Sequence, residues 1–457
     1  MRSSLRSRRP AAWLAGGTLA AFLGCAPSTP PLETDVDTPV VFTVPGESTS
    51  PVRWWTVFGD ASLDSLVARA LRANPDVLVA DARLREASAR IGFERSAYFP
   101  DLRATAGAEV REGEGFDTAD EMRLGLDSTV ELDLFGSIRS AVEAERLRAA
   151  AADAARRAVQ LDVAAAVAST WSRLLEARSQ VDLLLRQEET NEAVLILLEN
   201  RFGSGQIRGV DILRQRQLLE STRERAAEER GRVRTLENAM AVLPGRAPGR
   251  DLRATGVELP ALPPVPRTGA PATLVQRRPD VQRAWLELHA ADRDLATAIR
   301  RQYPRLDLTA SVTTAATGPG GLFEDWIGSL AGNLLAPLFT GGRLDAEVDR
   351  TEAIRARRLH EYTRTVLEAF LEVEDALALE EARAERIGRL ENQVELARQA
   401  YEQLRNQYLN GLGGYLDVLT ALTEEQELQR ALLTARRARL ESRIDLYRAL
   451  AGPLDES

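Results

Sequence analysis

Side chains able to do chemistry are sparse in this 457-residue sequence, which holds two histidines and one cysteine. His289 and His360 lie far apart in charged, helix-forming segments, with no Cys, Met or second His at the spacing of metal ligands. We find no paired nucleophile and base, and no glycine-rich phosphate loop. The sequence therefore predicts no catalytic residue, no metal and no cofactor, and an enzyme is not expected.

The single cysteine, Cys25, follows a predicted targeting segment. Four arginines precede an apolar run over residues 11–23, which is too short for a permanent transmembrane helix. The sequence Phe22-Leu23-Gly24-Cys25 resembles the bacterial lipobox, whose cysteine is acylated and becomes the new N-terminus. We therefore predict a signal peptide over 1–24, lipidation at Cys25 and a Pro- and Thr-rich tether over 25–50. An ordinary buried thiol is the alternative.

The charge balance narrows the possible partners. The chain has 59 basic and 68 acidic residues, and removing the predicted signal peptide takes away four arginines and no acid. The remainder, 55 against 68, has a net charge of −13, which does not suit binding to nucleic acid. Ala26 stands where an Asp would favour retention in the inner membrane. We therefore predict the outer membrane of a Gram-negative bacterium.

Two long helices are predicted to position the rest of the chain. Ser137–Phe202 contains no Gly or Pro, and an unbroken helix of this length reaches roughly 100 Å. Arg343–Asn410 is a second long segment, without Pro and with one Gly, Gly388, and its apolar residues follow the heptad spacing of a coiled coil. These residues are Ile387, Leu390, Val394, Ala397, Tyr401, Leu404 and Tyr408. Repeat 1 is also predicted to begin with a short helix, a turn at Asn74-Pro75 and a second helix that ends at Pro100. Return helices over 210–243 and 415–450, and a helix over 279–303, complete the predicted helical part.

The chain is an internal duplication. Four residues recur 204 positions later, namely Pro75, Pro100, Phe135 and Arg139 as Pro279, Pro304, Phe339 and Arg343. Asn200–Leu213 recurs as Asn406–Leu419, at a displacement of 206. We therefore predict repeat 1 over 51–245, a Pro-rich crossover over 246–272, repeat 2 over 273–452 and a tail over 453–457.

Each repeat also contains two segments in which apolar and polar residues alternate. They cover about 101–112 and 121–134 in repeat 1, and about 305–317 and 326–339 in repeat 2. A period of two over about ten residues is typical of strands that cross a bilayer. Four strands cannot close a barrel alone, because an open sheet edge in hydrocarbon leaves backbone groups unsatisfied. Two copies would give about eight strands and a filled barrel, whereas three give about twelve and a water-filled bore.

Several stretches resemble TolC-type outer-membrane efflux lipoproteins, of the branch that serves resistance-nodulation-division pumps. They are WWTVFGDASLDSL from Trp54, the turn at Asn74-Pro75-Asp76, LVQRRPDV from Leu274, LFGSIR and LFTGGR from Leu134 and Leu338, and GLGGYLDVL from Gly411. The resemblance covers about residues 50–452. It implies a mainly α fold with a membrane β-barrel portion, in which each of two tandem repeats has long coiled-coil helices and a two-strand hairpin. It further implies a homotrimer with a shared barrel of about twelve strands and a periplasmic α-helical barrel.

The resemblance also implies partners and a gate. The duct would dock to a periplasmic adaptor and an inner-membrane pump, through tip turns in which Gly205 and Gly411 end the long helices. Leu416 resembles an apolar constriction residue, and Asp417 stands where members often carry an acidic ring; Asp211 is the counterpart of Asp417 in repeat 1. Three carboxylates on one axis repel one another and attract cations. Alternatively, both aspartates only stabilise the starts of the return helices.

Three acidic residues of repeat 1, Asp127, Glu131 and Asp133, are predicted to face the barrel lumen and to favour cations. The alternative is a solvated strand face with no part in selectivity.

The predicted function is a passive exit duct for small exported compounds, in contact with outer-membrane lipid and powered by the pump it docks to. The duct of a protein-secretion system and a lipid-anchored coiled-coil scaffold without a pore are the alternatives. The lipobox and Arg277-Arg278-Pro279-Asp280 favour drug or metal efflux, and the four alternating strands argue against a scaffold. The cargo is set by the pump and is not encoded in this chain.

Overall fold

The computed structural model describes residues 41–44, 51–111, 119–249, 258–452 and 454. These residues form two compact units, and both repeats contribute to each of them. One unit contains Leu84–Ala152 and Arg283–Thr363, and the other consists of Val36–Arg83, Asp153–Gln282 and Arg364–Ser457. The predicted signal peptide and Cys25 lie outside the described residues.

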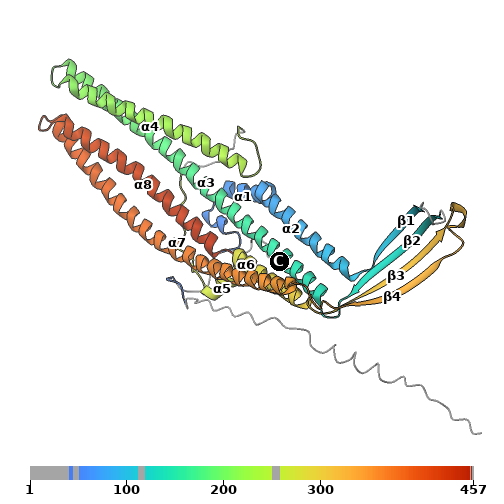
Figure 1. Cartoon of the computed structure of the whole chain (residues 1–457). Helices are drawn as coiled ribbons and strands as arrows, with labels where there is room; N and C mark the ends of the chain where they lie inside the picture. The colour runs from blue at the N-terminus through green and yellow to red at the C-terminus, as the bar shows by residue number, and fades with distance from the viewer. Residues whose placement is uncertain (1–40, 45–50, 112–118, 250–257, 453, 455–457) are drawn as a thin grey trace, which may run out of the picture. The chain divides into compact units, whose positions relative to one another are not determined.

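The first unit contains one antiparallel sheet of four strands in the order β1-β2-β3-β4 (Figure 1). The strands are β1 (Asp101–Arg111), β2 (Ala119–Leu132), β3 (Arg305–Ala316) and β4 (Ile327–Leu335). A hairpin from repeat 1 therefore pairs with a hairpin from repeat 2 through β2 and β3. Two of the predicted strands were too long at their C-terminal ends. β2 ends at Leu132, and β4 ends before Pro337, which has no backbone N–H for a ladder.

The strand register gives the sheet one polar face and one apolar face. Asp127 lies opposite Arg103 on β1 and Ser311 on β3, and Ser311 lies opposite Ser329 on β4. Residues one position away occupy the other face, because successive side chains in a strand alternate. That face is apolar and includes Leu102, Leu124, Leu126, Val130, Leu306, Leu308, Val312, Leu330 and Leu334.

The helices occur in sets that follow the duplication. Repeat 1 contains α1 (Ala61–Ala73), α2 (Pro75–Arg95), α3 (Ser137–Gly203) and α4 (Gly209–Val242), and repeat 2 contains α5 (Pro271–Arg277), α6 (Pro279–Arg300), α7 (Arg343–Leu409) and α8 (Tyr415–Leu450). Short 3-10 turns lie at Trp54–Phe58, Ser96–Tyr98 and Pro319–Gly321. The long helices α3 and α7 are both 67 residues long. None of the helices among the described residues is long and apolar enough to cross a membrane.

Local capping explains where several helices begin. The Asp60 carboxylate accepts hydrogen bonds from the backbone N–H groups of Ser62 and Leu63, at 2.7 and 3.2 Å, which caps α1. The Asp133 carboxylate accepts from the N–H groups of Ile138 and Arg139, at 3.1 and 2.7 Å, in the first turn of α3. Each cap satisfies donors that a helix N-terminus would otherwise leave without a partner.

The core of the second unit is rich in aromatic residues. Trp54 stacks on Tyr447 of α8 with ring centroids 6.2 Å apart, and Trp171 of α3 donates its indole N–H to Asp60 at 3.0 Å. The apolar heptad positions of α7 also pack as predicted, since Ile387 and Leu390 are buried against Ala435 of α8. Contacts of this kind hold α7 and α8 together as a helical hairpin.

Candidate functional site at the hairpin tips

Both hairpin turns end their long helix with the same hydrogen-bond pattern. Gly205 donates its N–H to Phe202 O at 2.8 Å, and Gln206 donates to Arg201 O at 3.0 Å. In the second turn Gly411 donates to Tyr408 O at 3.1 Å, and Leu412 donates to Gln407 O at 2.9 Å. This pair of bonds is the Schellman motif, which requires positive φ at the glycine. Gly205 and Gly411 have φ of 75° and 76°, so the predicted C-cap role of both is confirmed.

The first turn of α8 exposes the two residues predicted to form the gate. Leu416 is 49% exposed, and Asp417 is also exposed. The Thr420 hydroxyl donates a hydrogen bond to the backbone oxygen of Leu416, at 2.9 Å, in the same helix. Within one chain, Leu416 and Asp417 are therefore both accessible to solvent.

Asp211 occupies the equivalent position in α4 but has different surroundings. Its residue is 5% exposed, and its Oδ1 lies 3.7 Å from Arg208 Nη2 and 3.7 Å from Arg214 Nη1. The buried carboxylate therefore lies beside two guanidinium groups, one from the N-cap residue of α4 and one from within the helix. Asp211 and Asp417 therefore differ in burial although their sequence contexts match.

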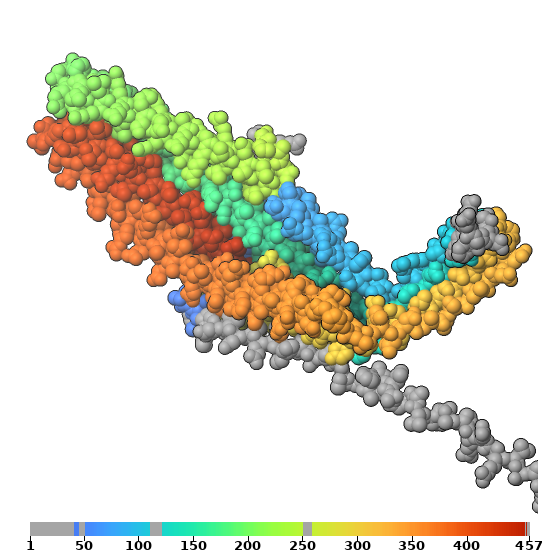
Figure 2. Space-filling model, viewed as in Figure 1, coloured from blue at the N-terminus to red at the C-terminus, as the bar shows by residue number. Residues whose placement is uncertain are grey.

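A small core joins the two tips. It comprises Leu198, Ile212, Tyr408, Tyr415 and Val418, which come from all four helices of the two hairpins. Figure 2 shows the ends of these hairpins, green and red-orange, side by side. Because the core draws on both hairpins, the two tips pack against each other within one chain.

Arg201 of α3 reaches across to the other hairpin. Its guanidinium donates to the backbone oxygens of Tyr408 at 3.3 Å and Leu409 at 3.0 Å, and lies 5.0 Å from the centroid of the Tyr408 ring. Its charge therefore stabilises the C-terminal end of α7. Sequence reasoning missed this contact, because the equivalent residue of repeat 2 is Gln407.

Buried amides continue this contact along the seam between α3 and α8. Asn191 and Gln426 exchange side-chain hydrogen bonds at 3.0 and 3.4 Å, and Asn191 also donates to the Thr222 hydroxyl of α4 at 2.9 Å. The Tyr415 hydroxyl donates to Gln215, which in turn donates to Asn191 O at 2.8 Å. Burial raises the pKa of the Tyr415 phenol, so this group remains a hydrogen-bond donor.

The amides could have been found from their spacing. Gln180, Leu184, Gln187, Asn191 and Leu198 follow steps of four, three, four and seven along α3. These are the spacings of core positions in a coiled coil, where a polar residue often fixes register at a cost in stability. The burial of these amides on α3 was therefore predictable, whereas their pairing with α8 was not.

The three acidic residues predicted for the barrel lumen do not share one environment. Asp127 and Glu131 lie on the polar face of the sheet, opposite Ser311 and Asp307 of β3, and the Thr105 hydroxyl donates to Asp127 at 3.2 Å. Asp133 follows the end of β2, and its carboxylate caps α3 as described above. A lumen role for Asp127 and Glu131 is consistent with their face, whereas Asp133 is occupied by the helix.

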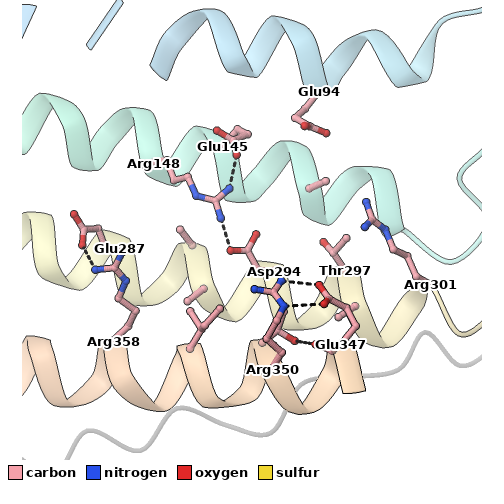
Figure 3. Close-up of a pocket in the computed structure, with 16 residues that line it drawn as sticks. Glu94, Glu145, Arg148, Glu287, Asp294, Thr297, Arg301, Glu347, Arg350 and Arg358 are labelled. Carbon is pink, nitrogen blue, oxygen red and sulfur yellow. Dashed lines mark hydrogen bonds and ion pairs between the residues drawn. The ribbon is translucent and has the colours of Figure 1, made fainter. Parts of the chain in front are cut away.

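A charged cavity of about 500 Å³ lies in the first unit, between α2, α3, α6 and α7 (Figure 3). Arg148 bridges Glu145 and Asp294, and Arg358 binds Glu287 at 2.8 Å. Arg350 binds Glu347 at 2.6 Å. Most of the guanidinium groups that line the cavity are bound to carboxylates of the chain itself, so we assign no ligand here. Among the described residues, no group of three or more His, Cys, Asp or Glu side chains could hold a metal.

The arginine pair before α6 has a structural role. Arg278 is 8% exposed and binds Asp280 at 2.7 Å and Glu372 of α7 at 2.9 Å. Its Nη1 also donates to Ala449 O at 3.4 Å. Burial opposes ionisation of Asp280, but the hydrogen bond from Arg278 outweighs it and lowers the pKa of this carboxyl. Arg278 therefore ties the start of α6 to α7 and to the end of α8.

Comparison with known proteins identifies the family of this chain. A family profile described as "Outer membrane efflux protein" matches residues 66–246 and 270–452. The chain belongs to the outer membrane efflux protein family. The two matched segments fall on the two repeats, which confirms the predicted duplication, the efflux function and the outer-membrane location.

Individual relatives of this outer membrane efflux protein agree with that assignment. The pyoverdine export outer membrane protein OpmQ of Pseudomonas aeruginosa is 30% identical over 452 residues, covering 94% of each chain. The cation efflux system protein CusC of Escherichia coli K12 is 27% identical over 404 residues, covering 87% of this chain and 88% of CusC.

Solved structures show the same fold. The outer-membrane channel OprN superposes with a TM-score of 0.88 at 26% identity, covering 94% of this outer membrane efflux protein and 100% of OprN. The open state of the MtrE channel of Neisseria gonorrhoeae gives a TM-score of 0.85 at 25% identity, covering 95% and 99%. The mainly α fold with a four-stranded hairpin sheet is thus that of outer-membrane channels.

Proposed function

We propose that this outer membrane efflux protein works as a homotrimeric exit duct, in which three copies pool their strands into one barrel of about twelve. The observation that carries the proposal is the sheet itself. Among the described residues, β1 and β4 each pair on one side only, and every residue of β4 is exposed. Edge backbone groups in hydrocarbon cost several kcal/mol each unless another chain pairs with them.

Aromatic residues support a membrane boundary at one end of the sheet. Phe99 precedes β1, Phe135 follows β2, Tyr303 precedes β3 and Phe339 follows β4. In an antiparallel sheet these four positions lie at the same end. Phe339 is 91% exposed, and Phe135 packs on Tyr303 with ring centroids 5.1 Å apart. Aromatic girdles of this kind mark the membrane–water interfaces of β-barrels.

We also propose partners for the hairpin tips and residues for the gate. The tip turns at Gly205 and Gly411 would meet a periplasmic adaptor, which links the duct to an inner-membrane pump of the resistance-nodulation-division class. Leu416 and Asp417 would line the constriction. The duct performs no catalytic step. Relatives are named for cargoes as different as pyoverdine and cations, which suits a duct that takes its cargo from the pump.

Cysteine cross-linking between the two sheet edges tests the trimer. We would place one cysteine on the polar face of β1, at Arg103 or Thr105, and one on β4, at Ser329 or Ala331, with Cys25→Ser in all variants. Oxidised outer-membrane extracts should give dimer and trimer bands on non-reducing gels. Thr129→Cys on the inner strand β2, combined with Ser329→Cys, is the matched control and should give none. A product that stays monomeric with every edge pair would rule out the shared barrel.

A further inference from the structure

A short segment of the N-terminal tether is docked on the second unit. Phe42 is 2% exposed, and its ring meets that of Phe370 of α7 edge to face, with centroids 6.0 Å apart. Phe370 itself is 7% exposed. Burying two aromatic rings against each other stabilises this contact through lost apolar surface as well as ring geometry. The tether is therefore not a free linker at this point.

Polar contacts fix the same segment in register. The backbone N–H of Thr43 donates to Glu374 Oε1 at 3.1 Å, and its hydroxyl donates to Glu374 Oε2 at 2.5 Å. Both oxygens of one carboxylate thus hold one residue, and hydrogen bonds to a charged acceptor are stronger than neutral ones. The next residue, Val44, accepts a hydrogen bond through its backbone oxygen from the Thr268 hydroxyl at 2.6 Å.

Thr268 connects this contact to the crossover between the repeats. It is 3% exposed and lies seven residues after Ala261, within the Pro-rich segment. The same segment is held on α8, since Arg443 donates to Pro264 O at 3.0 Å. Residues 41–44 therefore join three parts of the chain: the tether, the crossover and α7.

We propose that Val41–Val44 is an internal clasp that fastens the lipid-bearing tether to α7 and to the crossover. The clasp makes Phe42 the point at which the tether is attached to the folded protein. From Cys25 to Phe42 is 17 residues, which span at most about 60 Å when fully extended. This statement of reach rests on the proposed lipidation of Cys25, whereas the clasp itself does not.

Disulfide trapping in the full-length protein tests the clasp. In a Cys25→Ser background, Thr43→Cys with Glu374→Cys should form an intrachain disulfide that leaves a monomer band on denaturing gels. Thr43→Cys with Asp375→Cys is the matched control, because Asp375 is exposed and lies about 100° further around the helix. A yield no higher than this control, or a disulfide between chains, would overturn the clasp.

A second substitution keeps the test sensitive to the anchor residue. Adding Phe42→Ala to the trapping pair should lower the disulfide yield about tenfold, because the docked state then loses the ring contact with Phe370, and the hydrogen bonds from Thr43 to Glu374 are already removed by the cysteines. Adding Val41→Ala should leave the yield unchanged, since Val41 is 63% exposed. Equal yields in these two variants would contradict an anchoring role for Phe42.

Stepwise shortening of the tether separates the clasp from the proposed lipidation. Deletions of increasing length within residues 27–38 should leave the disulfide intact in the Cys25→Ser form. In the form that retains Cys25, the disulfide should be lost beyond a threshold length, because the lipid then pulls the clasp from α7. Mass spectrometry of the N-terminal peptide reports acylation independently. Loss of the disulfide on shortening in the Cys25→Ser form as well would overturn the clasp, whereas an unacylated protein would refute only the lipidation.

Discussion

The guanidinium of Arg201 in repeat 1 lies 5.0 Å from the centroid of the Tyr408 ring in repeat 2 and donates to the last carbonyl oxygens of α7. Replacing it by methionine removes these hydrogen bonds and keeps the aliphatic packing. We expect Arg201→Met to lower the free energy of unfolding by about 1 to 2 kcal/mol. Denaturant unfolding followed by near-UV circular dichroism measures this. Arg216→Met is the control, because its pair with Glu199 is exposed.

The exposed pair in α8 predicts a change in conductance. Leu416→Ala combined with Asp417→Ala should raise single-channel conductance in planar bilayers, since it removes both bulk and repulsive charge from the constriction. The counterparts Val210→Ala and Asp211→Ala should instead cost about 1 to 2 kcal/mol of stability, because Asp211 is buried between two arginines. Unchanged conductance in the α8 variant would remove Leu416 and Asp417 from the gate.

The amide pair at the α3–α8 seam predicts a strong coupling. Asn191→Leu or Gln426→Leu alone leaves one buried amide without its partner, which should cost about 2 kcal/mol. The double variant should lose clearly less than the sum, because both polar groups are then removed together. A double-mutant cycle of unfolding free energies tests this, and additive losses would show that the two amides act independently.

The Arg278 contact predicts a dependence on pH. Arg278→Met leaves Asp280 and Glu372 without their cation and should cost about 2 kcal/mol at pH 7, a value reduced for the partial exposure of both carboxylates. The pKa of Asp280 is lowered in the folded state, so its contribution is present above the unfolded pKa of about 4 and is lost as pH falls through the folded value. The gap between wild type and variant should therefore shrink at pH 3, as thermal unfolding at both pH values would show.

The acidic residues after Gly125 predict two separate effects. Asp127→Asn with Glu131→Gln should shift the reversal potential under a salt gradient toward lower cation preference, since both lie on the polar face of the sheet. Asp133→Ala should leave the reversal potential unchanged and lower stability by about 1 kcal/mol through loss of the α3 cap. A shift caused by Asp133→Ala would place that residue in the lumen after all.

Much of this fold could be predicted because the internal duplication gives the same elements in both repeats. Pro75 and Pro279 begin matching helices, and the long helices of both repeats begin where predicted, at Ser137 and Arg343. The ends of the strands were harder to predict. The alternation of apolar and polar residues continues to Leu134, although the hydrogen-bonded strand β2 ends at Leu132. The short helix Pro271–Arg277 was not predicted, since seven residues in a Pro-rich segment show too little periodicity to separate a helix from a loop.

The candidate site was predicted in part. Glycines at Gly205 and Gly411 identify the turns, because positive φ restricts the residue type. The different burial of Asp211 and Asp417 could not be read from their matching sequence contexts, because it depends on Arg208 and Arg214 and on how the hairpins pack. The contact of Arg201 joins residues 207 and 208 positions apart and leaves no local pattern in the sequence.

The two tips have the same glycine turn but differ in the residues around it. In a trimer, each copy contributes one tip of each kind. Three copies would present six hairpin ends in alternating kinds, one with a buried Asp211 and one with an exposed Asp417. The six tips would therefore have similar backbones, related by approximate sixfold symmetry. Their charged side chains would repeat with threefold symmetry only. Identical partner subunits would then bind at two inequivalent sites, and the two sites would differ in affinity for the partner and in how salt changes that affinity.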